Sequence, residues 1–223
     1  MASGRSRWAW FGWLAGLVAV GVVAYYTSEV LRARADTPRI VERALASDRL
    51  VLSVDDLSQA QLEALLAIQD PRFFSHKGWD FAGGTMTTIT QSLVKGLYFQ
   101  QFRPGIRKIR QSLIARFALD PQMSKKDQLR LFINTVWLGS LDGRSIEGFA
   151  QGAEAFYGKQ FAELTFDEFL SLLMFDRPAE LNVYVNPEGN RRRVRQIKRL
   201  LAGQGRRPGL LRRAPNCWTE DPS

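Results

Sequence analysis

The sequence predicts a mainly α-helical domain that follows one N-terminal transmembrane helix. Apolar side chains recur at helical spacing along most of the chain, alternating strand-like runs are scarce, and Trp8 to Tyr26 is an uninterrupted apolar stretch. The 223 residues suffice for such an anchor and one globular domain. The expected segments are a cytoplasmic tail over 1–7, the anchor over 8–26, the domain over 45–203 and a flexible basic tail over 204–223.

The apolar stretch has the length and the flanking residues of a membrane anchor. About 20 apolar residues cross a bilayer as a helix, and aromatic residues at both ends, including Tyr25 and Tyr26, suit its two interfaces. Arg5 and Arg7 precede the stretch, so the positive-inside rule places the N-terminus in the cytoplasm and the domain outside it. A cleaved signal peptide is the alternative, but the run is long for one and the bulky tyrosine pair is a poor cleavage site.

Helix starts in the exported part are marked by short polar side chains that can cap a helix. The expected starts are Ser58 with Gln61, Thr87 or Thr88, the Pro104-Gly105 turn, Ser124 with Asp127, the region of Ile146, Thr165 with Glu168, and Asn186-Pro187. In the helix after Gly105 we expect Ile106, Ile109, Leu113 and Phe117 to face inward. Gly158 and Gly203 are expected to end the two helices that precede them.

Composition restricts the chemistry that the chain can perform. With the single cysteine Cys217 and the single histidine His76, neither an internal disulfide nor a zinc cluster is expected. The formal charge of +9 favours an anionic partner: nucleic acid, lipid headgroups or a phosphorylated substrate. The predicted outside orientation argues against nucleic acid. The acid-free basic stretch from Gly189 to Thr219 is either a solvated helix face with a loose tail or a binding surface.

Three stretches in the first half of the chain resemble a known family. Residues 69–80 read Q-D-P-R-F-F-S-H-K-G-W-D and resemble E-D-x-x-F-x-x-H-x-G-x-D, the first motif of the peptidoglycan glycosyltransferases (transglycosylases), with Gln69 in place of its glutamate. Residues 87–95, T-T-I-T-Q-S-L-V-K, are similar to the second motif, S-T-I-T-Q-Q-L-x-K. Residues 107–111, R-K-I-R-Q, are similar to the third, R-K-x-x-E, with Gln111 in place of its glutamate.

Two later stretches extend the resemblance. Residues 126–134 follow the fourth motif, a helix that ends in a Tyr/Phe-Leu/Ile-Asn signature, and residues 145–159 match the fifth. Five motifs in the family's order over about residues 45–200 are specific together, although any one alone would be weak. The chain resembles a divergent, monofunctional-type member, because it ends too soon after this region for a transpeptidase domain.

The resemblance implies a lysozyme-like domain on the outer, periplasmic face of the bacterial inner (cytoplasmic) membrane. Such domains polymerise lipid II, a disaccharide-pentapeptide carried on undecaprenyl pyrophosphate. The expected partners are lipid II or nascent glycan strands, the membrane and another cell-wall synthase, and not nucleic acid. Only six residues separate Asp80 from Thr87, fewer than is usual in the family, so the membrane-side lobe is expected to be reduced.

The family's chemistry needs a base for the acceptor hydroxyl and positive charge for the departing pyrophosphate. The resemblance places Gln69 at the position of the catalytic base and Gln111 at that of the glutamate on the leaving-group side. An amide cannot accept a proton at physiological pH, so catalysis is expected to be lost or much reduced. Asp70 is the candidate for a relocated base, although adjacent helical positions point about 100° apart.

The remaining site residues carried over by the resemblance are hydrogen-bond donors and cations for the substrate. They are Arg72, His76, Thr88, Thr90, Gln91, Lys95, Arg107 and Lys108. A solvated basic face is the other interpretation of the cations at 107, 108 and 110. No metal ligand set is predicted, and a loosely held divalent cation is the only cofactor left open.

Two functions follow, a catalytically silent module that holds lipid II or glycan, and an active monofunctional transglycosylase with a relocated base. A lysozyme-like glycan-cleaving enzyme is a weaker third, because it too needs an acid in the cleft.

Overall fold

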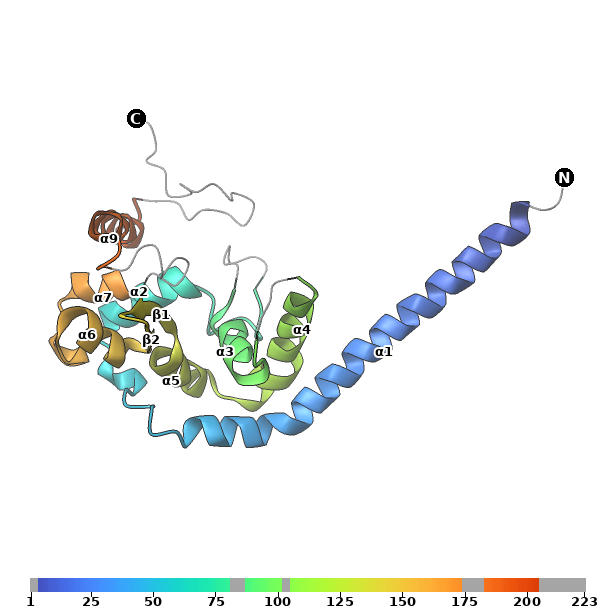
Figure 1. Cartoon of the computed structure of the whole chain (residues 1–223), viewed down its shortest axis with the longest axis horizontal. Helices are drawn as coiled ribbons and strands as arrows, with labels where there is room; N and C mark the ends of the chain where they lie inside the picture. Colours follow the sequence, from blue (N-terminus) through green and yellow to red (C-terminus); the bar gives the residue numbers. More distant parts are fainter. Residues whose placement is uncertain (1–3, 81–86, 102–104, 174–182, 205–223) are drawn as a thin grey trace, which may run out of the picture.

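The computed structural model describes residues 4–80, 87–101, 105–173 and 183–204. Figure 1 shows a helical domain from which one long N-terminal helix extends. The predicted mainly α class is confirmed. The expected tail beyond Gln204 lies outside the described residues.

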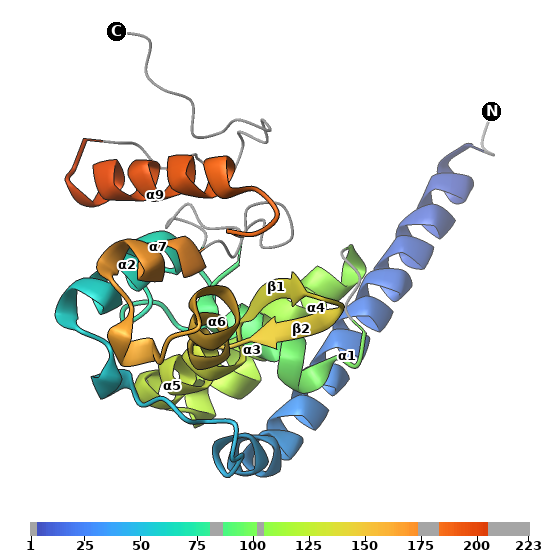
Figure 2. The same ribbon diagram turned by 60° about the vertical axis from the view of Figure 1, so that its left-hand side comes forward.

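Helices make up most of the described chain. The α-helices are α1 (Gly4–Leu45), α2 (Gln59–Gln69), α3 (Ile89–Tyr98), α4 (Ile106–Ile114), α5 (Lys125–Thr135), α6 (Phe149–Tyr157), α7 (Phe166–Leu172) and α9 (Pro187–Leu201). Short turns of other helical types lie at η1 (Val54–Asp56), η2 (Ala115–Leu119), η3 (Asp120–Gln122) and η4 (Phe161–Glu163). Two antiparallel strands, β1 (Trp137–Leu141) and β2 (Arg144–Glu147), form the hairpin visible in Figure 2.

The predicted helix caps are confirmed. Ser58, Thr88, Ser124 and Thr165 each accept a hydrogen bond from the backbone N–H three residues later, which satisfies one of the free donors of the first helical turn. At the other end of a helix, Gly158 adopts φ 62° after α6, the left-handed conformation that glycine adopts without strain. Local sequence therefore fixed where most helices begin and end.

The core of the domain is built around aromatic side chains from distant parts of the chain. Phe73, Phe132, Phe149 and Phe169 are almost completely buried. Phe149 stacks on Phe161 with ring centroids 6.1 Å apart and meets Phe169 edge to face at 5.5 Å. These contacts join α6, η4 and α7.

The helix α1 is continuous from the apolar stretch into the domain, but it bends where it meets the domain (Figure 1). Pro38 lies inside the helix and has no N–H, so the carbonyl of Arg34 loses its helical partner. The Gln122 side chain donates to that carbonyl at 3.1 Å, and the Arg34 guanidinium donates to the carbonyl of Phe117 at 2.8 Å. The domain thus supplies the hydrogen bonds that the bend removes.

A further contact joins α1 to the domain. The Glu29 carboxylate lies 2.7 Å from the Arg110 guanidinium, so an ion pair connects α1 to α4. Among the described residues, α1 is the one helix that is long and apolar enough to cross a membrane, and its residues 10–24 are exposed.

Two predictions about element faces and types were wrong. Ile109 and Phe117 are 52% and 44% exposed, because α4 packs on the domain through the face that carries Gln111 and Ile114. Past Ile114 the helix continues as the wider π-type turn η2. Ile146 lies in β2 rather than in a helix. The hairpin turn Asp142-Gly143 has positive φ at both residues, 50° and 76°, a preference of Asp-Gly turns that the helical interpretation overlooked.

Candidate functional site

The carboxylate of Asp70 is completely buried at the end of α2, where it caps α2 and supports the start of α3. Its two oxygens lie 3.0 and 2.9 Å from Nε2 of His76, and one of them also accepts the backbone N–H of Ile89 at 2.9 Å. His76 Nδ1 in turn accepts the N–H of Gly78 at 3.1 Å. These contacts occupy both carboxylate oxygens with donors from the protein, so Asp70 holds the loop after α2 against the N-terminus of α3.

The second and third motifs meet through buried polar groups. Thr88 donates to the carbonyl of Gly78 at 2.8 Å, and Gln91 closes the capping box by accepting the N–H of Thr88 at 3.0 Å. The amide of Gln91 donates to Ser112 at 2.7 Å. Gln111 is 1% exposed, and its amide nitrogen donates to the carbonyl of Gln91 at 2.5 Å. We call Asp70, His76, Thr88, Gln91 and Gln111 the buried network.

The amide of Gln111 fits this position in a way that a carboxylate would not. Its nitrogen supplies the hydrogen that the Gln91 carbonyl accepts, and a carboxylate has no hydrogen to supply. The other amide atom, Oε1, is buried without a hydrogen-bond partner among the described residues. Gln111 therefore joins α4 to α3 through its N–H rather than through its oxygen.

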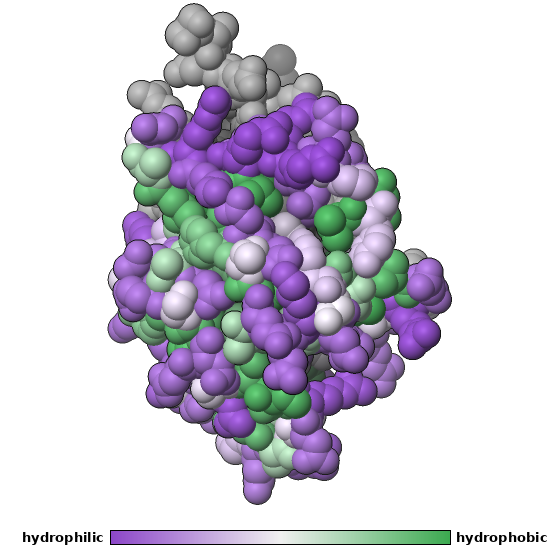
Figure 3. Space-filling view, turned by 90° about the vertical axis from the view of Figure 1, so that its left-hand side faces the viewer, coloured by the Kyte–Doolittle hydropathy of each residue, from purple (hydrophilic) through white to green (hydrophobic). Residues whose placement is uncertain are grey.

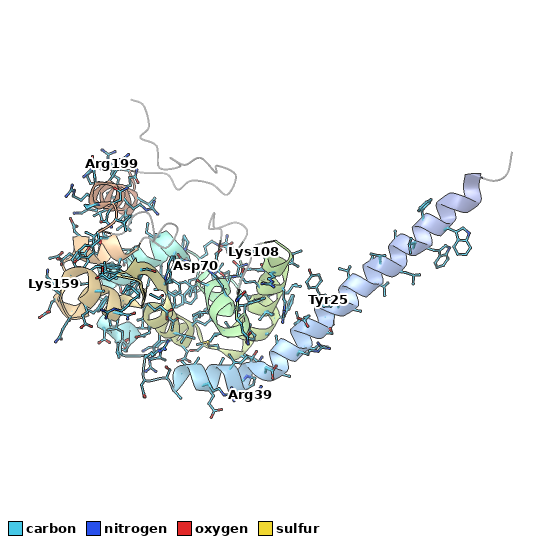
Figure 4. The ribbon with its side chains drawn as sticks, viewed as in Figure 1. Tyr25, Arg39, Asp70, Lys108, Lys159 and Arg199 are labelled. Carbon is cyan, nitrogen blue, oxygen red and sulfur yellow. The ribbon has the colours of Figure 1, made fainter. Side chains whose placement is uncertain are left out.

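A second group of polar residues lies at the more open end of the network. Gln69, the last residue of α2, is half-buried, and its amide lies 3.4 Å from the carbonyl of Thr87. The ammonium of Lys108 donates to the Thr87 hydroxyl at 2.8 Å, and Lys95 lies close enough to act on the charge of Lys108. We call Gln69, Thr87, Lys95 and Lys108 the amide–lysine cluster. Figure 4 shows Asp70 and Lys108 in the middle of the domain.

The two lysines of the cluster repel each other. Burial lowers the pKa of Lys108 below the ordinary lysine value of 10.5, and the positive charge of Lys95 lowers this pKa further. An anion that bound between the two ammonium groups would relieve the repulsion and raise the pKa of Lys108 toward its ordinary value. The cluster is thus suited to a phosphate-bearing ligand.

Three of the predicted substrate contacts are engaged elsewhere. Thr90 is fully buried and donates to Gln128 at 2.7 Å. Arg107 is exposed and donates to the carbonyl of Gln101 at 2.7 Å, and Arg72 lies 3.1 Å from the Asp80 carboxylate. Thr90 therefore supports packing, while the arginines stay near the surface.

Two residues of the site were missed from the sequence. Thr87 was considered only as a helix cap, yet it contacts both Gln69 and Lys108. Gly78 has φ 87°, and a Cβ atom there would lie 2.4 Å from the carbonyl oxygen of Ala115 in the π-type turn. The glycine in the first motif is thus required by close packing, a signal that a single sequence does not carry.

A divalent cation does not fit the residues present. In the described part of the chain, no three His, Cys, Asp or Glu side chains gather to form a metal site. The position that would offer a third-motif carboxylate carries the amide of Gln111, and the open cluster offers ammonium groups instead of oxygen ligands. In this arrangement the charge available for a phosphate group comes from Lys95 and Lys108.

Comparison with known proteins gives a consistent result. The family model described as Transglycosylase matches residues 38–202. The chain is similar to penicillin-binding protein 1B of Buchnera aphidicola, with 33% identity over 157 residues, which is 62% of this chain and 21% of that protein. It is also similar to penicillin-binding protein 1A of Neisseria flavescens, with 31% identity over 159 residues, 64% of this chain and 19% of that protein.

A shorter relative is matched over more of its length. A Cupriavidus necator protein with a provisional transglycosylase name is 28% identical over 147 residues, 60% of each chain. In contrast, the match spans only about a fifth of the two penicillin-binding proteins.

Proposed function

The chain belongs to the transglycosylase family, whose domain is lysozyme-like, and on that premise we propose that it holds lipid II or nascent glycan strands in cell-wall biosynthesis with lost or much reduced catalysis. The observation that carries the proposal is Gln69. An amide that shares the contact residue Thr87 with Lys108 stands at the position where the family has its base, and an amide cannot take the proton of an acceptor hydroxyl.

The alternative of a relocated base at Asp70 finds little support in the geometry. A general base must come within hydrogen-bond reach of the proton that it abstracts. The Asp70 carboxylate is 0% exposed and already accepts hydrogen bonds from the His76 ring and from Ile89. Freeing it for substrate would uncouple the loop after α2 from the start of α3. We therefore assign Asp70 to structure.

Ligand binding is the part of the family's function that the remaining residues support. Lys95 and Lys108, beside the hydroxyl of Thr87, offer two charges and a donor to a pyrophosphate group. The proposal for the ligand is therefore a polyprenyl-pyrophosphate-linked disaccharide such as lipid II. Nascent glycan strands are the second ligand, and they would interact through sugar hydroxyls rather than through charge.

The proposed location follows from α1. This helix would cross the bacterial inner membrane once, with the N-terminus in the cytoplasm and the domain on the outer face. A chain that holds lipid II there without polymerising it would act together with another cell-wall synthase.

A paired binding and polymerisation assay tests the proposal. The full-length protein in detergent is mixed with fluorescent lipid II; binding is read by anisotropy and polymer by gel electrophoresis. We expect saturable binding and no polymer. Binding should weaken roughly tenfold on Lys108→Met, in keeping with the loss of one charge-assisted contact of about 1.5 kcal/mol. Glycan chains from the wild-type protein would refute the silent-module proposal, and failure to bind would refute the ligand.

Restoring the base is the companion experiment. Gln69→Glu places a carboxylate in the half-buried position near Lys108 without disturbing the buried network, so it should be made alone first. A gain of polymerisation would show that the rest of the site is competent. Gln111→Glu is a poor first choice because its position needs the N–H of an amide.

A further inference from the structure

Helix α9 has two faces of opposite character. Val194 and Ile197 are buried against the domain, where α9 packs on α7 and α2. The outer face carries four exposed arginines, spaced three to four residues apart or adjacent, so that they lie on one side of the helix: Arg191, Arg192, Arg195 and Arg199. We call these four residues the arginine face.

Within the described residues, the charge of this face has little acidic compensation. Glu188 is the only acid in α9, and Lys198, next to Arg199, pairs with the domain at 2.7 Å from the Asp167 carboxylate. Within the described residues, none of the four arginines forms an ion pair or a side-chain hydrogen bond. Solvated basic faces in globular proteins usually intersperse acids, and this one does not.

The position of α9 in the molecule is specific. In Figures 1 and 2, α9 lies along one edge of the domain, and the C-terminal half of α1 lies along the opposite edge. The apolar N-terminal half of α1 extends back toward the side where α9 lies. Figure 3 shows a strongly hydrophilic band at this edge, over α9, and Figure 4 shows Arg199 there. The arginine face and the apolar half of α1 therefore point to the same side of the domain.

We propose that the arginine face docks on anionic phospholipid headgroups of the membrane that α1 crosses. Guanidinium groups bind phosphate in a forked, two-point geometry and keep their charge at any physiological pH. A basic residue close to an anionic leaflet strengthens attachment by about fivefold at physiological salt. Four such residues on one rigid helix form a second attachment point besides α1. The inference rests on the proposed anchoring by α1, but not on any catalytic or ligand-binding role.

Two attachment points fix an orientation that one helix leaves free. A single transmembrane helix permits the domain to tilt and rotate, whereas contact through α9 would hold one edge of the domain against the bilayer. Lys108 of the amide–lysine cluster lies between α9 and α1 (Figure 4). Docking would therefore keep the cluster at a constant height above the lipid surface.

The test measures how close α9 comes to the bilayer. The full chain, with Cys217→Ser to remove the native thiol, carries a spin label at Ala202→Cys, the exposed residue that ends α9. It is placed in nanodiscs that contain a nickel-chelating headgroup lipid, with either phosphatidylcholine alone or phosphatidylcholine with phosphatidylglycerol. Relaxation of the label by the nickel reports proximity. We expect it to be several-fold stronger with phosphatidylglycerol and to fall at high salt.

The decisive variant changes all four arginines of the arginine face to glutamine. We expect relaxation in the anionic discs to drop to the level seen in phosphatidylcholine. The matched control removes four exposed cations outside α9, namely Arg39 and Arg43 of α1, Arg49, and Lys126 of α5, and should leave relaxation unchanged. A second label at Ala46→Cys, at the end of α1, should stay remote in both lipids.

Equal relaxation at position 202 in both lipids, or no effect of the four glutamines, would overturn the proposal and assign the face to an anionic protein partner. The glutamine variant should keep the wild-type thermal unfolding temperature, since the four side chains form no hydrogen bond or ion pair within the described residues. Lipid II is absent throughout. A negative result in the relaxation test therefore says nothing about whether the protein binds lipid II. A protein that does not insert into nanodiscs would contradict the proposed anchoring by α1.

Discussion

The buried network and the amide–lysine cluster lie side by side, yet they have kept different parts of the family's motifs. In the buried network, Asp70, His76, Thr88 and Gln91 retain the motif's residue types, and each is hydrogen-bonded within the protein. In the cluster, both lysines match the motifs, but Gln69 stands where the first motif has a glutamate. Gln111 makes its hydrogen bond within the buried network, but like Gln69 it stands where the motif has a glutamate.

The difference shows that the motifs serve two purposes that can separate. Asp70 and Gln69 are adjacent in the chain, but one is sealed in the interior and the other is half-buried beside two cations. Loss of a buried partner would cost folding stability, while replacing a carboxylate by an amide at the open position costs mainly chemistry. Most of the motif pattern can therefore be kept for stability even where position 69 carries an amide.

The largest expected effect is on the buried network. Asp70→Asn removes the charge that His76 and the start of α3 contact, and it turns an N–H₂ group toward one of its donors. We expect the free energy of unfolding to fall by about 3 kcal/mol, as when one partner of a buried pair is removed. Denaturant unfolding in detergent measures this.

The control is the same change at an exposed cap. Asp127→Asn affects a surface carboxylate that accepts from Ser124, and it should cost about 1 kcal/mol or less. If Asp70→Asn and Asp127→Asn lowered the free energy of unfolding equally, the stabilising role assigned to Asp70 in the buried network would be wrong.

The next effect concerns Gln111. In Gln111→Glu a carboxylate would face the carbonyl of Gln91 in a buried site, with no hydrogen to donate, so we expect a loss of about 2 kcal/mol at pH 7. Burial raises the pKa of an unpaired carboxyl above its ordinary value of about 4.3, and the neutral acid can donate. The loss should therefore be small at pH 4 and grow as the pH rises.

Gln69→Glu is the comparison for this change. Because position 69 is half-buried near Lys108, its effect on stability should stay within about 0.5 kcal/mol across the same range. Full stability of Gln111→Glu at pH 7 would contradict the assigned role of the Gln111 amide.

The smallest effect is expected at Lys108. Burial and Lys95 disfavour its charge in the folded state, so its folded pKa lies below the unfolded value of 10.5. The resulting cost is fully present below the folded pKa and disappears as the pH rises from the folded pKa toward 10.5. Lys108→Met should therefore stabilise the protein slightly at pH 7, by less than about 1 kcal/mol, with the advantage shrinking toward pH 10.5. Thermal unfolding at several pH values checks this, and a destabilised variant would show that its hydrogen bond to Thr87 outweighs the repulsion.

Some of the site was predictable because its signals are local. Capping boxes at Ser58, Thr88 and Thr165 depend on side chains three residues apart. The amides at positions 69 and 111 can be recognised in the sequence because the motifs have glutamate there. The inward faces of α4 and the hairpin were not predicted. The π-type turn η2 and the pairing of β1 with β2 arise from packing between segments, and no short-range pattern specifies them.

The sequence by itself determined the helical class, the long apolar helix, most helix ends, and the absence of a proton-accepting group at position 69. Each depends on the chemistry of residues a few positions apart. Only the tertiary structure decided that Asp70 is enclosed by donors from α3 and the loop after α2, that the nitrogen of Gln111 makes its contact, and that α9 lies on the side toward which the apolar half of α1 extends. These are properties of burial and direction, which the chain acquires only when distant segments pack together.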